Sequence, residues 1–333
     1  MGGNTGSTKI AIKYIKDHPL MKDYTLAKLM YKDHPLLFSS FDAARSRIRY
    51  VRGHYGDTHR KQSPKEFHTP LNHDTKNTFA DFPSSAPKLK IFKLPTAIKN
   101  ILFLTDIHLP YQDNDALIAA LDYGVAQDVD CIWLNGDVMD MYHASSHDKL
   151  PSKADIMYEF DFTKSFLQRL RMIYPTQTIY YKEGNHETRW RRLLMKRAPE
   201  IIGVAEFELK IILQLEQYKV HWIANETLVK FGSLNVIHGN EFKGGGMHPA
   251  KTLYNKAKTN IIAGDKHRTD VSIQSNLDND SAKVYSVGCL CDLNPEYYLF
   301  GHTTWNHGFA HIKMNGSKFT VSNYRIDKDG EIY

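Results

Sequence analysis

One stretch of the chain decides the class of fold: residues 100–108 read NILFLTDIH. A short apolar run that ends in polar residues is typical of a strand buried on both faces, as in a parallel sheet. Here the run is followed at once by Asp106 and His108. Ligands and catalytic groups of α/β proteins lie beyond the carboxyl ends of such strands. The stretch therefore predicts a buried strand that carries a functional site at its end.

The same pattern recurs further along the chain. CIWLNGD at 131–137 and TIYYKEGN at 178–185 are two more buried strand candidates. Helical patterns alternate with the strands or follow them, at residues 114–127, 153–173, 186–197, 199–217 and 249–258. Short strand-like runs lie closer together in the second half of the chain. We therefore expect a layered α/β (α+β) fold, in which two sheets pack together with helices outside.

Changes in sequence texture predict three regions. Residues 1–62 read as three short helices interrupted by Pro19 and Pro35, in the pattern of a helix-turn-helix bundle. Residues 63–95 contain five prolines among polar residues and show no sustained periodicity, which is typical of a linker. Residues 96–333 hold the alternating strands and helices and form the main domain.

Basic charge is concentrated in the N-terminal segment. Residues 1–62 contain twelve Lys and Arg against five Asp, a net charge of +7, whereas the whole chain carries +6. Such asymmetry predicts an anionic partner for this segment, most often nucleic acid. The alternative is a basic helical cap whose charges face solvent.

Cysteine content and hydropathy exclude several classes of protein. Cys131, Cys289 and Cys291 are too few for a disulfide framework, and we read them as buried thiols of a cytoplasmic protein. No apolar run reaches the roughly 18 residues that span a bilayer, so no membrane partner is expected. The N-terminus lacks the apolar stretch of a secretory signal. The oligomeric state stays open.

Polar motifs follow the predicted strands in order. They are D-x-H with Asp106 and His108, G-D-x-x-D with Asp137, G-N-H-E with Asn185 and His186, His238-Gly239, and G-D-x-H with Asp265 and His267. In an extended chain alternate side chains point the same way, so Asp106 and His108 are expected to hold one ion. The two oxygens of Asp137 suit a carboxylate that bridges two ions.

The donor set indicates the kind of metal. Carboxylate, amide and imidazole ligands without thiolate favour Mn, Fe, Zn or Ni over Ca or a structural zinc. Two ions ~3.5–4 Å apart hold a phosphoryl group between them and convert a water molecule into a hydroxide nucleophile. The motifs therefore predict a two-metal hydrolytic site.

Taken in order, these motifs resemble those of the calcineurin-like metallophosphoesterases, over roughly residues 100–310. The resemblance implies a double β-sandwich flanked by helices and two divalent metal ions, with Mn the first expectation and Fe, Zn, Ni or Mg as alternatives. It implies one ion on Asp106, His108, Asp137 and His267, and the other on Asp137, Asn185 and His238. It also implies that His186 protonates the leaving oxygen or stabilises the transition state.

One residue departs from the family pattern. The final motif is usually G-H-x-H, and Asp265 stands in place of its first His. Aspartate ligates metals, so Asp265 is kept as a candidate ligand. The change can equally weaken the second metal or shift the preference toward harder ions. Gly301-His302-Thr303-Thr304 is a rival location for the motif.

The substrate is less constrained than the reaction. Protein serine/threonine phosphatases typically have R-G after G-D-x-x-D, and here Met141 and Tyr142 follow Asp140. Arg189 and Arg192, on one face of the helix after G-N-H-E, are candidate phosphate-binding residues.

Together with the basic N-terminal segment, the arginines favour a phosphodiesterase or nuclease acting on DNA or RNA. A phosphomonoesterase acting on nucleotides or small phosphorylated molecules is the first alternative. A non-catalytic nucleic-acid-binding protein with a degenerate metal site is the second. The layout resembles phage-encoded members of the family, for which the host cytoplasm is the expected location.

Overall fold

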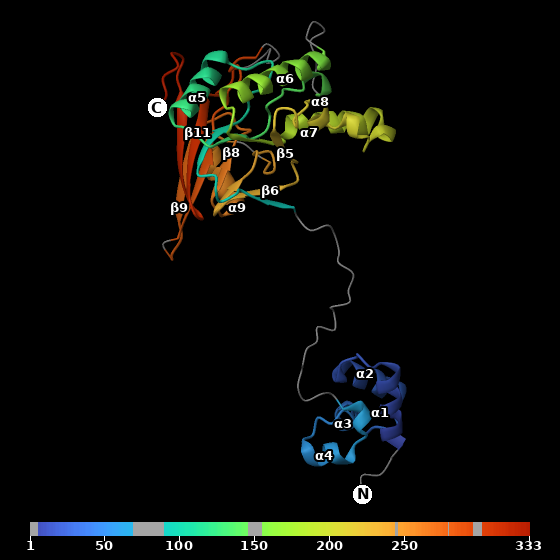
Figure 1. Cartoon of the computed structure of the whole chain (residues 1–333). Helices are drawn as coiled ribbons and strands as arrows, with labels where there is room; N and C mark the ends of the chain where they lie inside the picture. The colour runs from blue at the N-terminus through green and yellow to red at the C-terminus, as the bar shows by residue number, and fades with distance from the viewer. Residues whose placement is uncertain (1–5, 69–89, 146–154, 244–245, 279, 296–301) are drawn as a thin grey trace. The chain divides into compact units, whose positions relative to one another are not determined.

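The computed structural model describes residues 6–68, 90–145, 155–243, 246–278, 280–295 and 302–333. Contacts divide the chain into two units, Met1–Ala86 and Pro87–Tyr333, and each is described by itself (Figure 1). Within the described ranges no helix is both long and apolar enough to cross a membrane.

The N-terminal unit is a small helical bundle. Its helices are α1 (Gly6–Asp17), α2 (Asp23–Asp33), α3 (Phe41–Val51) and the short α4 (Asp57–Gln62). The first three match the three predicted helices, and α4 is additional. The helices α1, α2 and α3 each bury one apolar stripe, and α4 buries none. Together with Phe38 from the loop before α3, these stripes form a core of Ala11, Ile15, Leu26, Ala27, Met30, Phe38, Ala44, Ile48 and Val51. The Ser40 hydroxyl caps α3 by accepting a hydrogen bond from the Ala43 N–H at 3.1 Å.

The predicted linker, residues 63–95, falls largely outside the described residues. At its first end Lys65–Phe67 form a 3₁₀ turn. At its other end Ile91–Lys93 form β1, which pairs in parallel with β6 (Leu228–Phe231). Among the described residues, the strands of the second unit therefore begin at Ile91, before the boundary predicted at residue 96.

The first sheet of the second unit contains the strands predicted from the apolar runs. Its order is β12-β11-β2-β3-β4-β5. The strands β2 (Asn100–Leu104), β3 (Cys131–Leu134), β4 (Thr178–Lys182) and β5 (Val220–Ile223) run in parallel. The strand β11 (His307–Asn315) is antiparallel to β2 and to β12 (Lys318–Ile326). Parallel pairing brings the carboxyl ends of β2, β3 and β4 to one edge.

The second sheet has the order β1-β6-β7-β8-β10-β9. Its remaining strands are β7 (Leu234–Val236), β8 (Ile261–Ala263), β9 (Asp270–Ser275) and β10 (Ser281–Ser286). Because β7 and β8 are parallel, their carboxyl ends also meet at one edge. Each sheet thus contributes one cluster of strand ends.

The two faces of β2 show how the layers pack. Ile101 and Phe103 enter the core between the sheets, with Trp133, Phe231 and Ile262. The alternate residues of β2 enter a second core beneath α5 (Asn114–Ala126) and α6 (Ile156–Ile173). A third cluster joins α9 (Pro249–Ala257) to the outer face of the second sheet (Figure 1). The predicted double β-sandwich flanked by helices is confirmed.

The prediction of one helix over 199–217 is wrong. The segment instead forms two 3₁₀ turns, η3 (Pro199–Ile201) and η4 (Ala205–Phe207), and the short α8 (Leu209–Ile212). Gly203 has φ +91°, a backbone conformation outside the helical region. The preceding helix α7 (Asn185–Arg197) ends before Pro199, because the residue before a proline disfavours helical backbone.

Candidate metal centre

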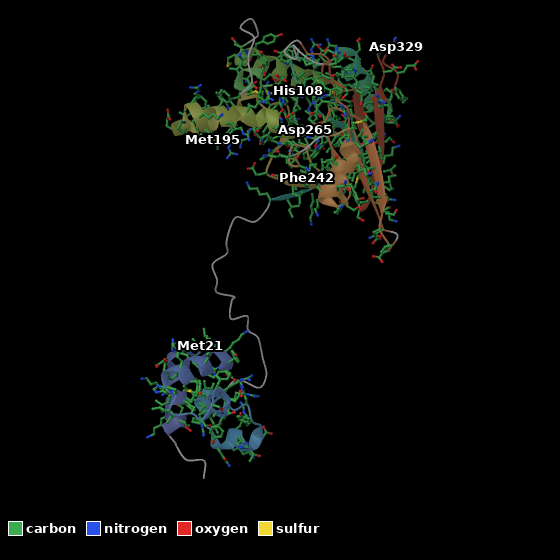
Figure 2. The ribbon with its side chains drawn as sticks, turned by 180° about the vertical axis from the view of Figure 1, so that it is seen from behind. Met21, His108, Met195, Phe242, Asp265 and Asp329 are labelled. Atoms are coloured by element: carbon green, nitrogen blue, oxygen red, sulfur yellow. The ribbon has the colours of Figure 1, made fainter. Side chains whose placement is uncertain are left out.

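The candidate ligands lie just beyond strand ends in both sheets. Asp106 and His108 follow β2, Asp137 follows β3, and Asn185 begins α7 after β4. His238 follows β7, while Asp265 and His267 follow β8. A hydrogen bond from the Asp265 N–H to the Asp106 carboxylate (2.9 Å) joins the two clusters (Figure 2 labels His108 and Asp265). The sandwich therefore brings all the predicted ligand positions to one edge.

Short distances connect these side chains. The Nε2 atom of His267 lies 3.2 Å from an Asp106 oxygen and 3.3 Å from His108 Nε2. The Nε2 atom of His238 lies 3.1 Å from an Asp137 oxygen. Three sets of possible ligand atoms converge within 4.8 Å among the described residues. One is His108, His267 and Cys291, and the other two are Asp106, Asp137 and His238, and His108, Asp137 and His186. Asp137 belongs to two of the three sets, as expected of a bridging carboxylate.

The backbone that presents these groups is left-handed, not extended. Asp106 and His108 have φ of 54° and 53°, and Asp137 has φ of 50°. Asp265 and His267 show the same conformation, with φ of 62° and 53°. The expectation that D-x-H aligns its side chains by strand alternation is therefore wrong. Tight turns after the strands do so instead, in a conformation that Asp and His adopt more readily than branched residues.

Two buried atoms in the centre lack a hydrogen-bond partner among the described residues: His238 Nε2 and Asn185 Oδ1. The other ring nitrogen of His238, Nδ1, lies 2.7 Å from the backbone oxygen of Asn135 and therefore donates to it. This orients the ring so that Nε2 is the nitrogen that faces Asp137. Buried polar atoms are normally satisfied, so an imidazole nitrogen and an amide oxygen left open here fit a metal cation.

His108 is oriented in the same way. Its Nδ1 lies 2.9 Å from a carboxylate oxygen of Asp140, which leaves Nε2 facing Asp106 and His267. Burial opposes ionisation of Asp140, but hydrogen bonds from His108 and His186 outweigh it and hold the pKa of Asp140 below its ordinary value. A carboxylate that orients a ligating histidine is a regular feature of metal sites.

His186 and Arg189 form the rim of the centre. His186 Nδ1 lies 2.7 Å from the backbone oxygen of Asp140, and its Nε2 is 3.6 Å from Asp137. Arg189 donates to the same Asp140 oxygen at 2.8 Å and lies 2.7 Å from His186 Nε2. Burial lowers the pKa of His186, but Asp137 and Asp140 outweigh it and raise that pKa above its ordinary value.

The two predicted phosphate-binding arginines have different positions. Arg189 reaches the centre through the Asp140 carbonyl, whereas Arg192 is exposed on α7. The two arginines lie on one face of α7, but Arg192 is almost one turn further from the start of the helix at Asn185. Only Arg189 is placed to meet a substrate at the metal centre itself.

A family model described as calcineurin-like phosphoesterase matches residues 99–305, which is more than half of the chain. The chain belongs to the calcineurin-like phosphoesterase family. It is therefore a metal-dependent phosphoester hydrolase. Members of the family typically bind two divalent ions, and the open atoms of His238 and Asn185 around Asp137 fit that requirement.

Individual relatives of the phosphoesterase are distant. It is 26% identical over 236 residues to the Gene 54 protein of Mycobacterium phage L5, covering 66% of this chain and 90% of that protein. The Gene 54 protein of Mycobacterium phage D29 is 27% identical over the same shares. Among solved structures, Vps29 of Chaetomium thermophilum has 13% identity and a TM-score of 0.36, covering 71% of this chain and 95% of that chain. A predicted phosphoesterase of Streptococcus pneumoniae TIGR4 has 12% identity and a TM-score of 0.28, covering 72% and 95%.

The final motif of the phosphoesterase lies at residues 264–267. Asp265 Oδ1 is 3.9 Å from His238 Nε2, and the other oxygen of Asp265 accepts a hydrogen bond from Lys266. His267 is buried beside Asp106, whereas His302 of the rival location is exposed. Asp265 therefore lies on the side of the centre where His238 Nε2 has no hydrogen-bond partner among the described residues.

The cysteines are free and buried, as predicted. Cys131 packs between the two sheets. Cys291 lies closer to the chemistry, with its sulfur 3.9 Å from His267 Nδ1. Part of the C-x-C pair thus packs against a candidate ligand.

Two carboxylates that support the ligands were missed as site residues. Glu187 is fully buried and accepts hydrogen bonds from the backbone N–H groups of Asp137 and Gly184. Glu241 accepts from the backbone N–H groups of His238 (3.0 Å) and Gly239 (2.6 Å), and from buried Lys182 (3.1 Å). Glu187 is the last residue of the G-N-H-E motif, and Glu241 lies three residues after His238. That proximity was the available signal, but it does not reveal which N–H groups the acids bind.

Proposed function

We propose that this phosphoesterase hydrolyses phosphodiester bonds in DNA or RNA, with Mn as its working metal. The observation that carries the proposal is the position of α7. The helix begins at the metal centre with Asn185 and continues with Arg189, Arg191, Arg192, Lys196 and Arg197. A polymeric anion that enters the centre can also contact the basic residues further along this helix. A small phosphomonoester is too short to reach them.

The residues assigned to each ion follow the family resemblance. Asp106, His108, Asp137 and His267 would hold one ion. Asp137, Asn185, His238 and Asp265 would hold the other, and the unpartnered atoms of His238 and Asn185 support that second set. Bound there, the ions supply positive charge at the phosphoryl oxygens and lower the pKa of a water molecule. The similarity to mycobacteriophage proteins supports a phage-encoded enzyme that acts in the cytoplasm of its host.

His186 and Arg189 supply the remaining chemistry. Because His186 Nδ1–H donates to the Asp140 carbonyl, a second proton on His186 resides on Nε2, which faces the centre. From there His186 donates to the leaving oxygen. Protonation also removes the lone pair that Arg189 approaches, so the Arg189 guanidinium becomes available to a phosphate oxygen.

The first test compares a chromogenic phosphodiester with a chromogenic phosphomonoester, in Mn²⁺, for the wild type, Asp137→Asn and His186→Ala. The proposal expects cleavage of the diester and loss of cleavage in both variants. Cleavage of the monoester alone would replace it by a phosphomonoesterase acting on nucleotides or small phosphorylated molecules. Absence of both activities and of bound metal, with Mn, Ni, Zn and Mg, would indicate the degenerate metal site.

The second test addresses the role of α7. Arg191→Ala/Arg192→Ala is compared with Lys251→Ala/Lys256→Ala, a pair of exposed lysines on α9. The arginine pair is expected to raise KM for a 20-nucleotide substrate and to leave the rate on the small diester unchanged. An equal effect of both pairs on the long substrate contradicts a nucleic-acid track along α7.

A further inference from the structure

The helix α3 has one buried face and one basic face, on which Arg45 is exposed and Arg49 is half-buried. Ala44, Ile48 and Val51 recur at helical spacing and pack in the core of the N-terminal unit. Arg45 and Arg49 are one turn apart on another side of the helix. The buried stripe therefore fixes the rotation of α3 and directs these two arginines away from the core.

Aromatic rings hold these arginines in place. The Arg45 guanidinium lies 5.8 Å from the ring centre of Tyr24, which is 57% exposed. The Arg49 guanidinium lies 5.4 Å from the ring centre of Tyr55, which is 41% exposed. Cation–π contact uses the face of the guanidinium and leaves its N–H donors for a second partner at the edge. The arginines are thus positioned in advance for an anion.

A third arginine serves the fold instead. Arg52 donates to the Asp23 carboxylate at 2.7 Å and to the backbone oxygen of Pro19, and so ties the end of α3 to the start of α2. Arg52 is therefore paired with a carboxylate, whereas Arg45 and Arg49 lie against aromatic rings. The role of Arg52 is structural and differs from that of the other two arginines.

The helix also matches one kind of polyanion in shape. α3 has 11 residues and packs on α2 through Leu26, Ala27 and Met30. The major groove of B-form DNA, about 12 Å wide, admits an α-helix, whereas the major groove of A-form RNA is too deep and narrow for side chains to read. A short helix whose solvent-facing side carries arginine guanidinium groups therefore suits the major groove of duplex DNA in shape and charge.

We propose that the N-terminal unit binds duplex DNA, with α3 in the major groove and with Arg45 and Arg49 contacting phosphates or guanines. The inference deepens the proposed function, because it names the nucleic acid that the hydrolase engages. The binding itself does not depend on hydrolysis. DNA binding requires only the folded N-terminal helices and the charge that they carry.

The test uses the full chain in EDTA and a fluorescein-labelled 20-base-pair DNA duplex, followed by anisotropy at several KCl concentrations. Arg45→Ala/Arg49→Ala is compared with Lys28→Ala/Lys32→Ala, which removes the same charge from exposed positions on α2. The arginine pair is expected to weaken binding at least about tenfold and to lower the salt dependence by about two ions, and the lysine pair to have a smaller effect. Unchanged thermal unfolding confirms that each variant is folded.

Three results would overturn the inference. An equal loss in both double variants would remove α3 as the interface. Equal or tighter binding of a single strand or an RNA duplex of the same sequence would replace duplex DNA as the partner. No binding at 50 mM KCl would leave the unit without a nucleic-acid role. The rate on the small chromogenic diester reports on the proposed hydrolysis separately, because the α3 variants leave the metal centre intact.

Discussion

Glu187 accepts a hydrogen bond from the backbone N–H of Asp137, with 3.0 Å between the nitrogen and Oε2. The same carboxylate accepts from the N–H groups of Val138 and Gly184, both at 2.8 Å, and from the Tyr181 hydroxyl at 2.8 Å. It therefore fastens the turn after β3 to the turn after β4. The position of Asp137 therefore depends on an acid that binds its backbone N–H and, among the described residues, no candidate ligand side chain.

Glu187→Gln replaces one carboxylate oxygen with an amide group that cannot accept these N–H bonds. We expect Mn affinity to fall about 10–100-fold, as for other groups that orient metal ligands. Stability should fall by about 2 kcal/mol, because buried donors lose their acceptor. Calorimetric Mn titration and thermal unfolding measure the two effects, with the exposed Glu226→Gln as the matched control. Wild-type Mn affinity in Glu187→Gln would contradict the positioning role.

Gly184→Ala tests the close approach of the same two turns. A Cβ at Gly184 would lie 2.6 Å from the Asp137 nitrogen and would also clash with the Asp137 carboxylate. We expect a loss of about 1–3 kcal/mol in stability from overpacking, together with lower activity on the diester. At Gly246 a Cβ would meet no atom closer than 3.7 Å, so Gly246→Ala is the control. Equal melting temperatures of the two variants would show that the turns after β3 and β4 can move apart to admit a methyl group without loss of stability.

Asp265→Ala tests whether aspartate serves where the family usually has histidine. We expect the metal content, measured by mass spectrometry after Mn loading and desalting, to fall from two ions per chain toward one. Asp265→His should keep two ions, because imidazole also ligates Mn. The exposed Asp280→Ala is the control for removing an aspartate. Two retained ions in Asp265→Ala would exclude Asp265 as a ligand.

Arg189→Ala distinguishes the two arginines of α7. Arg189 lies 2.7 Å from His186 Nε2, and Arg192 is exposed. We expect kcat/KM on the small diester to fall about 10–100-fold in Arg189→Ala, with unchanged Mn content, because a charged donor to the phosphate is lost. Arg192→Ala should stay near the wild-type rate on that substrate. Similar rates for both variants would remove Arg189 from the chemistry.

Glu159 gives a pH dependence of stability. Burial, followed by the charge of Asp140, raises the pKa of Glu159 from 4.5 to about 7, against backbone hydrogen bonds from Met141 and Tyr142. The folded chain therefore binds this proton more tightly than the unfolded chain. The corresponding stability is present below pH 4.5 and is lost as the pH rises through about 7.

Glu159→Gln keeps an oxygen for the Tyr142 N–H and removes the ionisation. Relative to the wild type, the variant should therefore be more stable at pH 8 than it is at pH 5. Thermal unfolding at the two pH values measures this difference, with the exposed Glu216→Gln as the matched control for the chemical change. A stability difference between wild type and Glu159→Gln that is the same at both pH values would contradict the shifted ionisation.

Local sequence predicted the strands of the first sheet well. The runs at 100–104, 131–134 and 178–182 are apolar on both faces, as expected of a buried strand with a core on each side. The segment 199–217 was mistaken for a helix because its apolar residues suit several short turns as well as one helix. Periodicity alone does not distinguish several short turns from one helix. The positive φ of Gly203 interrupts the helical backbone in this segment.

The sequence by itself determined the family, the order of the motifs and the chemical types of the candidate ligands, because each of these depends on residues close together in the chain. Tertiary structure alone decided how His238 and Asp265 of one sheet meet Asp106 and Asp137 of the other. It also decided the left-handed turns and the role of Glu187, whose partners lie up to 50 residues away. Such groups meet only after both sheets have packed, and no local pattern encodes the distance between them.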